Sequence, residues 1–153
     1  MSLVQKLAEQ GFPWMTVSER HSQFRLRSAK RVGELVFVSG QIPIKKNGTV
    51  VAGRVGDDVT PSQAADAARI CAAWSLFAAS TAVGPEGVTG VASMTVFIRC
   101  ASGFNETSRV AEGASELFEA VLGDAGVGTR AAVGVAELPA DAVVEISVVF
   151  TAR

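Results

Sequence analysis

The sequence predicts an α+β domain in which two helices pack on one face of a mixed sheet. Three observations support this prediction: short runs of alternating or apolar residues, two long helical patterns, and their order along the chain. The order is strands, helix, strand, helix and two further strands, and helices gathered on one face of a sheet are typical of it. The 153 residues are enough for one domain with a substantial core.

The two helices are predicted from their ends and their periodicity. The first is expected from Thr60 to about Ala82, because Thr60-Pro61-Ser62-Gln63 combines a capping hydroxyl, an early proline and a glutamine three residues after the cap. The second is expected to end at Gly123 and has the i, i+1, i+4, i+7, i+8 spacing of an amphipathic helix. Its apolar residues are Val110, Ala111, Ala114, Leu117, Phe118, Val121 and Leu122.

Residues 1–20 are interpreted as an N-terminal extension and residues 21–153 as a single domain. A short helix is expected over residues 2–10, with Leu3, Leu7 and Ala8 on one side and Gly11 at its end. The extension lacks the basic start and apolar run of a targeting signal.

Strands are expected where apolar residues alternate or cluster. The expected strands cover residues 23–28, 34–39, 94–99 and two segments within 126–150. Lys46-Asn47-Gly48 is typical of a hairpin turn, with residues 49–52 returning as a strand.

The last two strands are expected to form a hairpin around a tight connection at residues 138–141. If they pair directly, Arg130 and Glu145 lie on the same face, about 13 Å apart at 3.3 Å per residue. That separation is too long for an ion pair. Two interpretations are left: a cleft lies between the charges, or a neighbouring subunit completes the pairing.

Composition limits the partners. The chain has 14 basic and 15 acidic side chains, so its net charge of −1 does not favour a nucleic-acid or anionic-membrane partner. Hydrophobic residues make up 48%, which favours a surface buried between subunits. No apolar run reaches the roughly 18 residues of a membrane span. Cys71 and Cys100 lie in apolar segments and are expected to be buried thiols of a cytoplasmic protein.

Few residues remain for chemistry. His21 is the only histidine and no Cys-x-x-Cys or P-loop motif occurs, so a metal, a nucleotide and a Ser-His nucleophile are disfavoured. Arg130, between small residues, can bind a carboxylate with its planar fork. Glu145, in an apolar strand, is expected to have a raised pKa suited to holding a water or moving a proton. The alternative for both charges is a structural ion pair or a solvated sheet face.

Three segments together resemble the Rid family of reactive-intermediate deaminases, the YjgF type that is often labelled endoribonuclease L-PSP. They are residues 38–43 (Val-Ser-Gly-Gln-Ile-Pro), residues 128–139 (Gly-Thr-Arg-Ala-Ala-Val-Gly-Val-Ala-Glu-Leu-Pro) and residues 144–146 (Val-Glu-Ile). The resemblance covers roughly residues 31–152. It implies a chorismate-mutase-like fold that assembles as a homotrimer with clefts between subunits.

The resemblance also implies a reaction and assigns roles to residues. Arg130 would bind the carboxylate of a 2-imino acid and Glu145 would position the attacking water, while Ser39 and Gly40 would line the pocket. The products would be a 2-keto acid and ammonia, and no cofactor or metal would be required. The chain departs from the family pattern in having Ala132 where a cysteine is usual, Glu112 where an asparagine is frequent, and no tyrosine.

Two other functions stay open from the sequence. The missing cysteine and tyrosine motivate a non-catalytic trimer that binds a small carboxylate. The basic residues between Arg20 and Arg31 motivate an RNA-cleaving or RNA-binding protein, which the neutral net charge makes the less favoured of the two.

Overall fold

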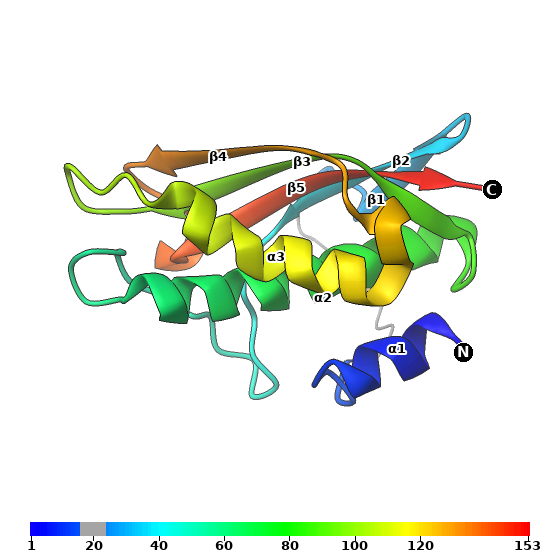
Figure 1. The fold of residues 1–153 in the computed structure, drawn as a ribbon, viewed down its shortest axis with the longest axis horizontal. Coiled ribbons are helices and arrows are strands. Elements are labelled where there is room, and N and C mark those ends of the chain that lie inside the picture. The colour runs from blue at the N-terminus through cyan, green and yellow to red at the C-terminus, as the bar shows by residue number, and fades with distance from the viewer. Residues whose placement is uncertain (16–23) are drawn as a thin grey trace.

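The computed structural model describes residues 1–15 and 24–153, which form two layers, a five-stranded sheet and a pair of long helices (Figure 1). Both long helices lie against the same face of the sheet, so the predicted α+β arrangement is confirmed. The strands are β1 (Ala29–Val32), β2 (Leu35–Gln41), β3 (Val88–Arg99), β4 (Thr129–Val135) and β5 (Val144–Ala152). The helices are α1 (Leu3–Glu9), α2 (Pro61–Val83) and α3 (Thr107–Leu122), with 3-10 turns at Gly123–Gly126 and Pro139–Asp141.

The sheet is mixed, with the order β1-β2-β5-β3-β4. All neighbouring pairs are antiparallel except β3 and β4, which run parallel. The predicted hairpin between the last two strands is therefore wrong, because β3 lies between β4 and β5. The tight turn at Pro139–Asp141 does form, with positive φ at Ala140 and Asp141. In this order β3, the longest strand with 12 residues, has hydrogen-bonded neighbours on both edges. A β4–β5 hairpin would leave one edge of β3 without a partner strand.

The helix ends agree with the sequence prediction. Thr60 caps α2 and forms a reciprocal capping box with Gln63, and Gly84 follows the last residue. Gly123, with φ +69°, follows α3. The two helices pack so closely that a Cβ on Gly113 would lie only 2.0 Å from the Ala65 carbonyl oxygen.

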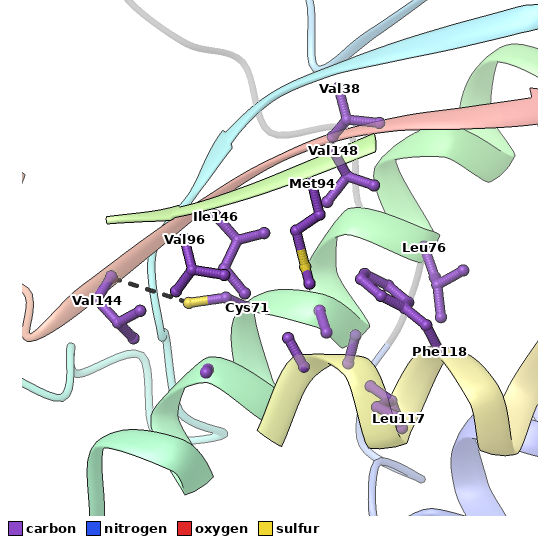
Figure 2. Packing of buried hydrophobic residues seen from close by; sticks show 14 of the residues in the cluster. Val38, Cys71, Leu76, Met94, Val96, Leu117, Phe118, Val144, Ile146 and Val148 are labelled. Carbon is purple, nitrogen blue, oxygen red and sulfur yellow. Dashed lines mark hydrogen bonds between the residues drawn. The ribbon is translucent and has the colours of Figure 1, made fainter. Parts of the chain in front are cut away.

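The core lies between the helices and the sheet (Figure 2). Side chains of β3 and β5, including Met94 and Ile146, point towards α2 and α3. Phe118 of α3 meets Phe150 of β5 edge to face at 5.4 Å. Cys71 is fully buried and Cys100 partly so, and both are free thiols, as expected.

The N-terminal helix forms as predicted, with Leu3 and Leu7 buried. The extension packs on the helical layer, where Trp14 contacts Trp74 edge to face at 5.9 Å. Lys6 Nζ donates to the Val121 carbonyl, 3.1 Å away, at the end of α3. No helix among the described residues is long and apolar enough to cross a membrane.

Two strand predictions need correction. The strand expected over 23–28 begins instead at Ala29, and residues 24–28 have no strand pairing, while Gln23 lies outside the described residues. The turn at 46–48 forms, with the Gly48 amide donating to the Lys45 carbonyl at 2.9 Å. Its return segment carries only isolated bridges, because its backbone bonds are divided between Pro43, Val143 and Asp141.

The close approach of α2 and α3 can be tested with Gly113→Ala. In an open helix this change would stabilise by about 1 kcal/mol. Here the added methyl meets a backbone carbonyl, so the variant is expected to lose roughly 1–3 kcal/mol of unfolding free energy, measured by urea titration. Ser108→Ala, at an exposed position of the same helix, should change it by less than about 0.5 kcal/mol. A stabilised Gly113→Ala protein would contradict the packing.

Candidate functional site

Arg130 lies on the edge strand β4 and reaches towards the helices. Its register partner on β3 is Met94, which is buried in the core, so Arg130 is on the helix-facing side of the sheet. Nη1 of Arg130 donates to Glu112 Oε1 at 2.6 Å and to Ser115 Oγ at 3.0 Å, both on α3. The Arg130 side chain is 25% exposed and that of Glu112 is 54% exposed. The guanidinium is therefore already held by a carboxylate of the same chain.

A groove of about 270 Å³ runs beside this ion pair, between α3 and the start of β4. Glu116 and Glu119 of α3 line it in addition to Glu112, and the exposed Val127 supplies apolar lining. Three carboxylates and one guanidinium thus face a single groove, whose formal charge is negative.

Glu145 lies on the central strand β5, on the face that the helices leave uncovered. Its register partner is Phe97 of β3, and the alternating burial of β5 places Val144 and Ile146 in the core and Glu145 opposite them. Partial burial removes water from the carboxyl group and raises its pKa above the ordinary value of 4.5. No cation among the described residues forms an ion pair with it. The carboxylate is available to a ligand or a water.

Ser39 and Gly40 border Glu145. The register between β2 and β5 shifts between Val38 and Gln41, which marks a β-bulge at this corner. A Cβ on Gly40 would lie 2.9 Å from Glu145 Cδ, so glycine leaves the space that the carboxyl group occupies. Ser39 Oγ donates to the Arg27 carbonyl at 2.6 Å, which fastens the segment before β1 to the corner.

The structure brings three of the four predicted site residues together but places Arg130 elsewhere. Arg130 and Glu145 were expected on one face, and this expectation is wrong. Their partners on β3, Met94 and Phe97, are three residues apart, and a strand alternates its faces at each residue. The sheet therefore separates the guanidinium from the carboxylate within one chain.

The uncovered face of the sheet exposes large apolar side chains beside polar ones such as Thr95 and Ser147. Its exposed large side chains include Val32 (55% exposed), Leu35 (36%), Phe37 (46%) and Val133 (42%). The strand register places them on the side of Phe97 and Glu145. An apolar patch of this kind on a sheet that helices cover from one side only is typical of a protein interface.

A second charged cluster was not foreseen from the sequence. Glu137 accepts from Arg54 and Arg99, both at 3.1 Å, and these hydrogen bonds, that of Arg54 first, lower the pKa of the exposed Glu137 carboxyl. Arg54 also donates to the Ala136 carbonyl, and Arg99 to that of Gly53. The cluster fastens the loops around β3 to one another. Ser115 was also missed, since its contact depends on α3 lying over β4.

No group of three or more histidine, cysteine, aspartate or glutamate residues that could hold a metal occurs in the described part of the chain. His21 and Arg20, which the sequence singled out, lie outside the described residues.

Comparison with known proteins agrees with the motifs. The model of the family "Endoribonuclease L-PSP" matches residues 18–152. Protein TCP17 from Trypanosoma cruzi is 38% identical over 116 residues, which is 74% of this chain and 72% of that protein.

Solved structures share the fold. The protein Atu1372 from Agrobacterium tumefaciens, of unknown function, has a TM-score of 0.86 at 33% identity and matches 98% of this chain and 91% of its own. E. coli TdcF with bound serine has a TM-score of 0.63 at 26% identity, over 91% and 97% of the two chains. Since the family model spans nearly the whole chain and the fold is that of its members, the protein belongs to the endoribonuclease L-PSP family, also called the YjgF or Rid family.

Proposed function

We propose that the protein is a cytoplasmic, cofactor-independent deaminase that hydrolyses 2-imino acids and their enamine tautomers to 2-oxo acids and ammonia. The observation that carries this proposal is Glu145, a partly buried carboxylate with a raised pKa and no cationic partner among the described residues. The absence of a side chain at Gly40 makes room for this carboxyl group. A carboxylate kept in that state is suited to taking a proton from water near neutral pH.

A homotrimer would complete the site. Arg130 lies at the free edge of β4 and Glu145 on the apolar face, so the two can act on one substrate only if a neighbouring copy brings its edge to that face. Covering Phe37, Leu35 and Val133 would drive the association. Ser39 and Gly40 would then line the cleft between subunits. The serine bound to TdcF supports the proposal, since it is a small carboxylate-bearing molecule held by a relative.

The reaction follows from these positions. Arg130 binds the substrate carboxylate and so orients the imine carbon. Glu145 holds a water and accepts its proton as the water oxygen bonds to that carbon, while the C=N electron pair moves to nitrogen. Glu145 passes this proton to the nitrogen, which gives a carbinolamine. The carbinolamine hydroxyl then loses its proton to the nitrogen by the same route as the C–N bond breaks, and the nitrogen leaves as ammonia. Water supplies the oxygen of the 2-oxo acid, so no oxidant or cofactor enters the balance.

A non-catalytic trimer that binds a small carboxylate is the second candidate. The ion pair between Arg130 and Glu112 favours it, because the guanidinium is partly neutralised before any substrate arrives. Tight binding of 2-oxobutanoate with no acceleration of imine hydrolysis would identify this function instead.

The deaminase is tested by ammonia release from the imine that a threonine dehydratase produces from threonine. Glu145→Gln is expected to lower kcat by about 10²-fold or more, because the proton acceptor is lost. Arg130→Ala is expected to lower kcat/KM. Arg109→Ala, which removes an exposed arginine near the start of α3, should leave both unchanged. A wild-type protein that does not accelerate the reaction would refute the proposal.

The assembly is tested separately with Phe37→Glu. A charge on the apolar sheet face should dissociate the trimer to monomers, as measured by light scattering, and abolish deaminase activity with it. Val4→Glu places the same charge on an exposed apolar residue of α1, and this variant should stay trimeric. A trimeric Phe37→Glu protein would show that this face is not the interface.

The pKa of Glu145 also predicts a pH-dependent stability. Its folded-state pKa lies above 4.5, so the folded state binds the proton more tightly and loses stability as pH rises through the window above 4.5. Glu145→Gln should therefore unfold at a higher temperature than wild type at pH 8, with the difference vanishing below pH 4.5.

Glu137→Gln provides a control of opposite sign. The pKa of Glu137 is lowered, so its contribution is present above 4.5 and is lost as pH falls through the folded-state value. This variant should be less stable than wild type at pH 8 and equal to it at the lowest pH. Equal behaviour of the two variants would contradict the assigned environments.

A further inference from the structure

The guanidinium proposed to bind substrate already carries an internal carboxylate. Glu112 Oε1 lies 2.6 Å from Arg130 Nη1, and Ser115 Oγ accepts from the same nitrogen at 3.0 Å. Arg130 is the cation that pairs with Glu112 among the described residues. A substrate carboxylate that takes the full fork of Arg130 must therefore displace Glu112 or share the cation with it.

Displacing Glu112 without replacing its partner is unfavourable. Glu112 would face Glu116 and Glu119, which line the same groove, and an incoming carboxylate would add a further negative charge. Glu112 is 54% exposed, so water would compensate only part of the lost ion pair. A simple aliphatic 2-imino acid offers Glu112 no donor in exchange.

A ligand can avoid this loss by bringing its own cation. Its carboxylate would bind Arg130 while a cationic side chain takes the place of the guanidinium beside Glu112. Val127, which is 60% exposed in the lining, would contact the methylene groups between the two charges. The groove of about 270 Å³ is large enough for a side chain of this kind.

We propose that Glu112 determines the substrate class and selects 2-imino acids whose side chain ends in a cationic group over neutral ones of the same size. The kinetic part of this inference rests on the proposed deaminase function. The binding part does not, because it concerns only the exchange of ion-pair partners at Arg130.

The kinetic test compares arginine with citrulline, its uncharged isostere. An L-amino-acid oxidase with catalase generates the two 2-imino acids in situ, and ammonia release is followed with and without the protein. Wild type should prefer the arginine-derived imine by about five-fold in kcat/KM, and Glu112→Gln should bring that preference close to one. Glu9→Gln, which removes the same charge from an exposed position of α1, should keep the wild-type preference.

The binding test needs no turnover. Calorimetric titration of the full-length protein with 4-guanidinobutanoate and with 4-ureidobutanoate should show tighter binding of the cationic ligand by wild type. Glu112→Gln should bind the neutral ligand more tightly than wild type does. If wild type binds both ligands equally, or if Glu112→Gln leaves their ratio unchanged, the assignment to Glu112 is wrong. Absence of imine hydrolysis with the binding difference intact would refute the deaminase alone.

Discussion

The position of β3 between β4 and β5 is the constraint on which the candidate site depends. Because β3 pairs with both strands, the residues of β3 that lie beside Arg130 and Glu145 are three positions apart. Odd spacing along a strand means opposite faces, so no rotamer of either side chain brings the two groups together in one chain. The same topology leaves β4 as an edge and one sheet face bare, which are the two surfaces that an assembly would join. The separation of the two charges, the free edge and the uncovered face thus all follow from this strand order.

Glu145 shows how the scaffold accommodates a group that works against its stability. Partial burial disfavours the ionised carboxyl, and no cation among the described residues offsets that effect. The space for it comes from the bulge at Gly40, where any Cβ would contact the carboxyl group. A structural role would be better served by an ion pair of the kind that Glu137 makes with Arg54 and Arg99. The contrast between the two glutamates in one chain is what favours function at Glu145.

Much of the fold could be predicted from the sequence because its signals are local. The Thr60 capping box and the periodicity of α3 involve residues a few positions apart, and the structure confirms both. The hairpin prediction was wrong because the alternation of side chains along a strand shows which of its residues share a face. It does not show which other strand pairs with it. The contact of Ser115 with Arg130 and the partners of Glu137 were missed for a related reason. Arg54 and Glu137 are 83 residues apart, and only the assembled sheet and helices bring them into contact.

The exposure of the pair between Arg130 and Glu112 bears on its role. A carboxylate that is 54% exposed contributes little to stability, since exposed ion pairs are generally worth between 0 and about 1 kcal/mol. The sheet edge is therefore not held in place by this bond, and its partners can be exchanged without unfolding anything. What the pair does set is the charge that an incoming molecule meets at Arg130. The resemblance matches Glu112 to an asparagine that is frequent in the family. A glutamate in its place changes that charge by one unit, so selectivity can change within one fold.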